Sequence, residues 1–103
     1  MYCRMTLVRL KRGLSQDAQV IFQRSIMPAA RAQKGFRGIY WLQSVDNPTE
    51  CIGLSFWDSR EDAEENERSG YYSEQRDKIS QLVIPETVRK GYEVLAMAER
   101  PAG

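Results

Sequence analysis

The strand-like segments of this chain carry apolar side chains on both of their faces, and this feature restricts the possible folds more than any other. In a strand, successive side chains point to opposite sides of the sheet. One side of the segment 51–57 carries Ile52, Leu54 and Phe56, and the other carries Cys51, Gly53, Ser55 and Trp57. A sheet with one face in water would alternate apolar and polar residues. This chain therefore has to cover both faces of its sheet.

Strand-like and helical regions alternate in a defined order. Residues 2–10, 36–44, 51–57 and 86–98 are rich in aliphatic and aromatic side chains and predict four strands. Residues 15–34 and 59–82 show helical spacing, and the second stretch is interrupted at Ser69-Gly70. The order β-α-β-β-α-β predicts a ferredoxin-like α+β fold, a four-stranded antiparallel sheet with helices on one face. We expect residues 1–103 to form a single domain, with a frayed tail over 98–103.

Two local signals refine the helices. Pro28 lies inside the first helical region and has no N–H to donate to the carbonyl of Arg24, so we expect this helix to kink or restart nearby. Ser59 precedes the second region, and Asp62 follows three residues later as an acidic variant of the capping box. The second helix should therefore begin directly after Ser59.

Two helices can cover only one face of a four-stranded sheet. A bare second face would expose a larger apolar patch than monomers usually tolerate. A second copy of the chain, packed sheet against sheet with twofold symmetry, is the simplest cover. The sequence therefore predicts a homodimer.

Composition argues against several classes of function. The chain has no histidine, which removes the commonest general base, the commonest metal ligand and the usual proximal ligand of haem. Fifteen basic and fourteen acidic residues, with no concentrated basic face, make nucleic acid an unexpected partner. Cys3 and Cys51 lack a C-x-x-C spacing and predict two free thiols. No apolar run is long enough for a membrane span and no secretion signal is evident, so we expect a cytoplasmic protein without a membrane partner.

Two stretches resemble one known family. The run from Pro28 to Gly38, PAARAQKGFRG, resembles the helix-to-strand junction of the antibiotic biosynthesis monooxygenase (ABM) family. Residues 54–63, LSFWDSREDA, followed by Ser69-Gly70-Tyr71-Tyr72, resemble its strand-three tryptophan motif and the helix after it. The resemblance implies a dimeric α+β barrel with a substrate cavity between sheet and helices. It also implies either cofactor-independent oxygenation of aromatic polyketides and quinols, for which no cofactor is expected, or haem degradation.

The chain departs from the family pattern at three places. The polyketide oxygenases carry a donor Asn four residues before the motif tryptophan, where this chain has Gly53. The haem-degrading branch has a histidine nine or ten residues after the tryptophan, where Asn66 and Glu67 stand. The His-rich members place a histidine at the position of Tyr71. Haem binding therefore loses its expected iron ligand.

The candidate site is built around Trp57, whose ring can form the wall of a cavity and whose N–H can donate to a ligand, or which can be a core aromatic. Tyr71 and Asn66 are the other candidate catalytic residues, although Asn66 can equally lie on the solvated helix face. An arginine on an apolar strand needs a carboxylate partner, such as Glu93, or an anionic ligand. The candidate substrate-binding residues are Arg4, Thr6, Phe22 and Tyr72.

Two functions follow as hypotheses. The first is a cofactor-independent monooxygenase acting on a small aromatic or quinol-like substrate, which requires a dry aromatic pocket with a few oriented donors. The second is a non-catalytic module that binds a small apolar ligand in the same cavity, which the missing Asn and His favour.

Overall fold

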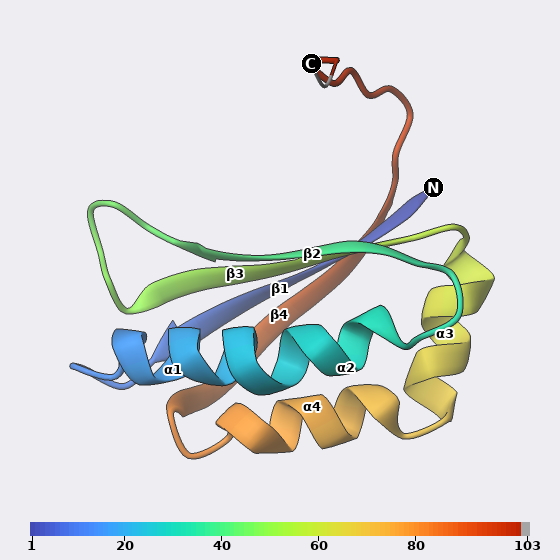
Figure 1. Ribbon diagram of the computed structural model, residues 1–103. Coiled ribbons are helices and arrows are strands. Elements are labelled where there is room, and N and C mark those ends of the chain that lie inside the picture. The colour runs from blue at the N-terminus through green and yellow to red at the C-terminus, as the bar shows by residue number, and fades with distance from the viewer. Residues whose placement is uncertain (102–103) are drawn as a thin grey trace.

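A four-stranded antiparallel sheet forms one layer of the molecule, and the helices form the other (Figure 1). The computed structural model describes residues 1–101, except for the side chains of residues 86 and 87. The strands are β1 (Tyr2–Leu10), β2 (Phe36–Gln43), β3 (Glu50–Trp57) and β4 (Val83–Glu93), in the sheet order β2-β3-β1-β4. The predicted ferredoxin-like α+β fold is confirmed.

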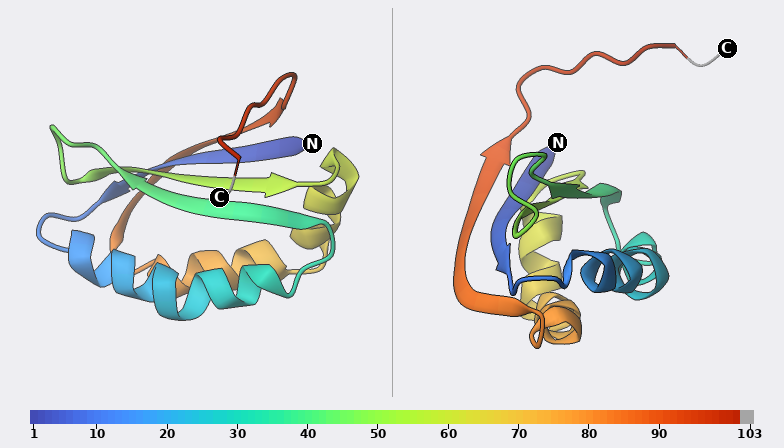
Figure 2. Two further views of the ribbon diagram at one scale, coloured as in Figure 1. Left: turned by 45° about the horizontal axis from the view of Figure 1, so that its top comes forward. Right: turned by 90° about the vertical axis from the view of Figure 1, so that its left-hand side faces the viewer.

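The helices lie beneath one face of the sheet and across one of its ends. The first helical region consists of α1 (Ser15–Ile21), a π-helical turn η1 (Phe22–Ile26) and α2 (Met27–Arg31). The second consists of α3 (Arg60–Arg68) and α4 (Tyr71–Ile79). Figure 2 shows α1, α2 and α4 running below the sheet, with α3 at its end. The expected disturbance near Pro28 takes the form of the wide turn η1, which ends two residues before the proline.

The Ser59 cap forms as predicted and fixes the start of α3. The backbone N–H of Asp62 donates to Ser59 Oγ at 3.1 Å, so the hydroxyl satisfies one of the free donors of the first turn. Glu61 and Asp62 in that turn complement the helix dipole. Because Ser59 follows Trp57 by two residues, this cap places α3 directly over the end of β3.

The last strand differs from its predicted range of 86–98. It begins at Val83 and ends at Glu93, because Glu93 pairs with Tyr2 and the backbone of Val94 donates to Met1, where β1 runs out of residues to pair with. Pro85 lies inside β4, which a strand at the sheet edge tolerates. A break in the register between the pairs Leu7–Val88 and Arg9–Ile84 takes up the extra residues.

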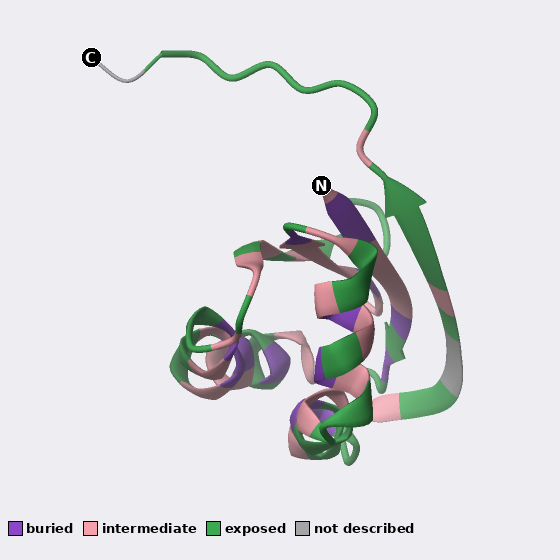
Figure 3. Ribbon diagram, turned by 90° about the vertical axis from the view of Figure 1, so that its right-hand side faces the viewer, coloured by how far each residue is buried: buried purple, intermediate pink, exposed green. Residues whose placement is uncertain are grey.

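The outer sheet face is mostly apolar, and no helix covers it in the single chain. Strand alternation and register place on it three charged residues, Arg9, Glu50 and Lys90, together with Cys3, Met5, Leu7, Gly38, Tyr40, Leu42, Ile52, Leu54, Phe56, Ile84, Val88 and Tyr92. Tyr40 is 57% exposed and Tyr92 is 48% exposed. Figure 3 shows β4 exposed along most of its length, whereas the buried stripes of the helices lie on the inner side. The sheet is therefore covered on one face only.

Candidate functional site

A cavity of about 130 Å³ lies between the inner face of the sheet and the helices. Every described strand and both helical regions contribute to its wall. The large apolar side chains of that wall include Phe22, Ile26, Phe36, Ile39, Trp41 and Trp57. Such a space, apolar with a few polar groups, is typical of a small-molecule site.

Two aromatic pairs define the cavity walls. Phe22, in the π-helical turn, stacks on Trp41 of β2 with ring centroids 4.2 Å apart and an interplanar angle of 15°. Phe36 meets Trp57 edge to face at 5.8 Å. Stacked and T-shaped pairs fix the rings of both partners. The cavity therefore has rigid flat surfaces suited to an aromatic ring.

Trp57 is the last residue of β3 and is buried. Its indole Nε1–H donates to Ser55 Oγ at 3.0 Å, two residues back on the same face of the strand. The ring lines the cavity as the sequence suggested, but its donor is occupied within the chain. Donation to a ligand would require this hydrogen bond to be exchanged.

Asn66 is buried, so the alternative that it lies on the solvated face of α3 is wrong. Its Nδ2 donates to the backbone carbonyl of Asp62 at 2.8 Å, one turn earlier in the helix. Because the partner is a carbonyl oxygen, the nitrogen must face it, and the orientation of the amide is fixed. Among the described residues nothing donates to Oδ1, and the side chain lines the cavity.

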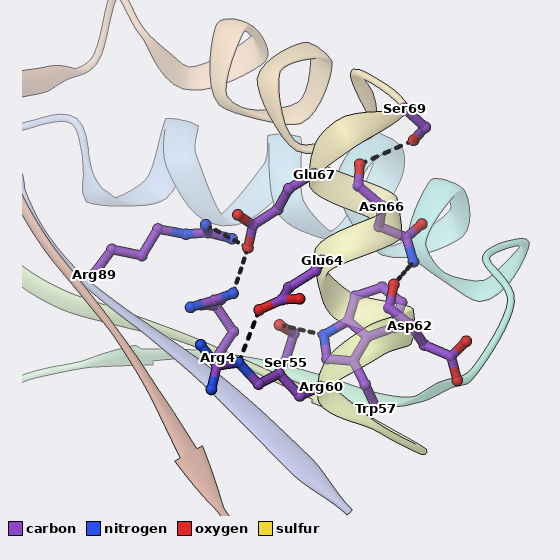
Figure 4. A network of polar contacts seen from close by, with 10 residues as sticks. All are labelled: Arg4, Ser55, Trp57, Arg60, Asp62, Glu64, Asn66, Glu67, Ser69 and Arg89. Carbon is purple, nitrogen blue, oxygen red and sulfur yellow. Dashed lines mark hydrogen bonds and ion pairs between the residues drawn. The ribbon is translucent and has the colours of Figure 1, made fainter.

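The partner of Arg4 is Glu67 on α3, not Glu93 (Figure 4). Arg4 Nη2 lies 2.7 Å from Glu67 Oε1, and Arg89 Nη1 on β4 lies 2.7 Å from the same oxygen. Glu93 is excluded because it pairs in register with Tyr2, whereas Gly91 stands opposite Arg4. The crossing of α3 over the sheet end supplies the carboxylate instead.

Tyr71 and Tyr72 begin α4, after Gly70 turns the chain with a φ of 88°. Burial raises the pKa of the Tyr71 phenol to about 12, so at neutral pH it is a protonated hydrogen-bond donor in the cavity wall. The guanidinium of Arg89 lies over the ring of Tyr72, 3.6 Å from its centroid. This cation–π contact holds the arginine against the wall.

We expect Tyr71 to ionise well above an ordinary tyrosine. The burial that raises its pKa from 10.0 to about 12 favours the neutral phenol, so the stabilisation is complete below pH 10 and is lost as the pH rises towards 12. The ultraviolet absorbance of the phenolates, followed against pH, should lose its highest step in Tyr71→Phe. The Ser73→Ala variant is the control, because it changes an exposed side chain of α4 and no phenol, and it should keep every step. Loss of a low-pH step in Tyr71→Phe would contradict the assignment.

The seven residues singled out from the sequence lie on the wall of one cavity: Trp57, Tyr71, Asn66, Arg4, Thr6, Phe22 and Tyr72. Their catalytic and binding roles stay predictions. Thr6 of β1 faces Arg89 on one side and Gly53 on the other in the sheet register. Sequence reasoning missed Trp41, Glu67 and Arg89 as part of the site. The strand alternation that places Arg4 on the inner face was the available signal for a partner. The crossing of α3 that supplies Glu67, and the register that places Arg89 opposite Thr6, could not be read from the sequence.

No described helix is long and apolar enough to cross a membrane. No group of three or more His, Cys, Asp or Glu in residues 1–101 is placed to hold a metal ion.

The fold is shared with solved structures of low sequence identity. A candidate antibiotic biosynthesis monooxygenase from Nitrosomonas europaea is 20% identical, with a TM-score of 0.77 over 93% of this chain and 100% of that one. SnoaB, a cofactor-independent oxygenase from Streptomyces nogalater, is 12% identical, with a TM-score of 0.76 over 96% and 97% of the two chains. No curated protein sequence matches the chain. The family model for antibiotic biosynthesis monooxygenase matches residues 1–78, and the chain therefore belongs to the antibiotic biosynthesis monooxygenase family.

Proposed function

We propose that this protein is a cofactor-independent monooxygenase that acts on a small aromatic or quinol-like substrate. The observation that supports this most is the cavity between the sheet and the helices, whose walls include two fixed aromatic pairs with a neutral phenol and an oriented amide beside them. The description of SnoaB as a cofactor-independent oxygenase adds weight, since that protein has the same fold.

Oxygenation without a cofactor requires the substrate to supply the electrons. For an anthrone, loss of a proton from the ring CH₂ gives a carbanion that reacts with O₂, and one oxygen atom remains on carbon as the new carbonyl. The second oxygen atom leaves as water with the two hydrogens, so the substrate loses four electrons and O₂ gains four. A protein promotes this reaction by stabilising the anion and excluding water.

Each candidate residue has a role consistent with its geometry. Trp57 forms a flat wall against the substrate ring. Tyr71, held neutral by burial, donates a hydrogen bond to a substrate oxygen that gains negative charge. Asn66 presents an amide that its bond to Asp62 holds in one orientation. These are the roles that we propose for them.

Oxygen consumption with a panel of anthrones and hydroxyquinols tests the proposal. We expect turnover by the unaltered protein, and a fall in kcat/KM of about tenfold in Trp57→Phe, which keeps a ring but loses the indole area and N–H. The Ser73→Ala control changes an exposed residue of α4 that does not line the cavity and should retain the rate. An absence of turnover with every substrate, or an unchanged rate in Trp57→Phe, would count against the proposal.

Binding without catalysis is the second candidate, and Gly53 is the observation that favours it. Gly53 lines the cavity at the position where the polyketide oxygenases are expected to carry a donor Asn. A Cβ atom added there would meet only Trp41, at an ordinary contact distance of 3.9 Å. The position therefore lacks a donor although the backbone does not require a glycine there.

Gly53→Asn should distinguish the two candidates. If the cavity catalyses oxygenation weakly, the added donor should raise kcat by about tenfold, since one oriented donor is worth this much or more. Gly53→Ala is the matched control, because it adds a side chain without a donor. Ligand-induced thermal stabilisation, with no product in either variant, would instead support the binding module.

A homodimer is the state in which we expect this activity. The outer sheet face is apolar, and Leu42 and Val88 on it are 41% and 46% exposed in the single chain. A second copy packed on this face would remove it from water without adding another element. The proposal thus predicts a symmetric pair with one cavity in each subunit.

A further inference from the structure

The cavity wall has more positively charged than negatively charged side chains. Among the described residues, the wall contains three arginines, Arg4, Arg76 and Arg89, and one carboxylate, Glu67. Three positive charges against one negative charge leave an excess of two, whereas the whole chain carries +1. Positive charge is therefore concentrated at this cavity.

The single carboxylate does not satisfy its two neighbours. Arg4 and Arg89 approach the same oxygen of Glu67 within ion-pair distance, but neither contact has hydrogen-bond geometry, so Oε1 accepts no hydrogen bond. The Nε of Arg4 and the Nε of Arg89 are both buried and have no partner among the described residues. Two donors of charged groups are thus withdrawn from water without a partner beside the cavity, a costly arrangement for guanidinium groups.

We infer that the cavity binds an aromatic acid, with the carboxylate of the ligand held by Arg4 and Arg89 and its ring held between the aromatic walls. The inference rests on the proposed function for the identity of the substrate site. A guanidinium presents Nε and Nη as a fork that matches the two oxygens of a carboxylate. The Tyr72 ring, 3.6 Å from Arg89, holds one of these forks in place before the ligand arrives.

A neutral aromatic ligand fits these walls less well. It would cover the arginines without supplying an acceptor and would leave both Nε donors unpaired in a drier site than before. Sites with polar groups that need a partner discriminate strongly against ligands that lack it. The acid should therefore be preferred over its neutral analogue of the same shape.

Isothermal titration calorimetry with 2-naphthoate and 2-naphthamide tests this inference. These probes share a ring system and differ in charge at one substituent. We expect the acid to bind at least about tenfold more tightly than the amide. Arg89→Met should remove most of that preference by weakening the acid about tenfold, while the amide stays within about twofold. Equal affinities for the two probes, or an equal loss of both in Arg89→Met, would overturn the inference.

Two further variants separate binding from folding. Arg37→Met removes an arginine that pairs with Asp58 at the surface outside the cavity, so it should leave both affinities unchanged. Arg89→Lys keeps the charge but loses the planar fork, and an intermediate affinity for the acid is expected. If Arg89→Lys binds the acid as tightly as the unaltered protein, bidentate recognition is ruled out. Circular dichroism of each variant verifies the fold.

The failure of this inference can be told from the failure of the proposed function. Acid-selective binding without oxygen consumption by any quinol would leave the inference standing and remove the oxygenase. If oxygen is consumed at the same rate with neutral anthrones and with their carboxylated analogues, the oxygenase proposal stands and the acid specificity does not. Calorimetry therefore tests the preference for an acid, and oxygen consumption tests the oxygenase activity.

Discussion

A single lysine at the centre of the outer sheet face, Leu7→Lys, is expected to convert the protein from a dimer to a monomer. Leu7 lies on the central strand β1, between Ile52 of β3 and Val88 of β4. In a symmetric pair the substitution buries one unpaired charge from each subunit close to the axis, which costs several kcal/mol. We expect self-association to weaken about a thousandfold, or about 4 kcal/mol.

Light scattering at low micromolar concentration measures this effect. The unaltered protein should give twice the chain mass of 11.9 kDa, and Leu7→Lys should give the chain mass itself. Ser73→Lys is the control, because Ser73 is exposed on α4, far from the outer sheet face. Its mass should remain that of the dimer. A monomeric mass for the unaltered protein would contradict the dimer directly.

Removing the charge of Glu67 is expected to be the most destabilising polar substitution in the site. Glu67→Gln leaves Arg4 and Arg89 facing each other without the carboxylate between them. Loss of one partner of a buried ion pair costs about 3–5 kcal/mol, and we expect about 2–3 kcal/mol here because these side chains keep some contact with water. Urea unfolding at one fixed protomer concentration measures the difference.

Glu64→Gln is the matched control for this measurement. Glu64 lies on the same helix and pairs with Arg60, whose side chain is 69% exposed. An exposed pair of this kind contributes little to stability because water screens it. A further variant, Glu67→Gln with Arg89→Gln, removes one of the two facing charges and should recover part of the lost stability. If Glu67→Gln and Glu64→Gln lower the free energy of unfolding by the same amount, the contacts of Glu67 with Arg4 and Arg89 do not stabilise the fold.

The element order could be predicted from the sequence because it depends on local patterns. A run of aliphatic and aromatic side chains on both faces marked β3, Ser59 marked the start of α3, and Pro28 marked the irregular helix. The last strand could not be bounded this way, because its limits depend on where β1 begins and on the break in register near Pro85. Pairing with another strand sets those limits, and the residues of β4 alone do not show which residues of β1 they pair with.

The residues of the candidate site also differ in whether local sequence could identify them. Trp57 and Tyr71 were identifiable because motif position and residue type both pointed to a cavity wall. The burial of Asn66 and the meeting of Arg4 with Glu67 depend on how α3 crosses the end of the sheet. Arg4 and Glu67 are more than sixty positions apart in the sequence. The patterns that predict β1 and α3 do not give the angle at which the helix crosses the strand.

The π-helical turn η1 determines how the buried residues of the first helical region line up along its axis. Its buried residues, Ala18, Phe22, Ile26 and Ala30, repeat every four positions. With about 3.6 residues per α-helical turn, each such step would advance the stripe about 40° around the axis, so Ala30 would rotate away from the face of Ala18. The wider turn at Phe22–Ile26 takes up part of this rotation and keeps the four side chains aimed at the sheet. A one-residue deletion within η1 that restored regular α-helical geometry would shorten the spacing from Ala18 to Ala30 to eleven residues, about 20° from a whole number of turns, so the stripe should stay on one face.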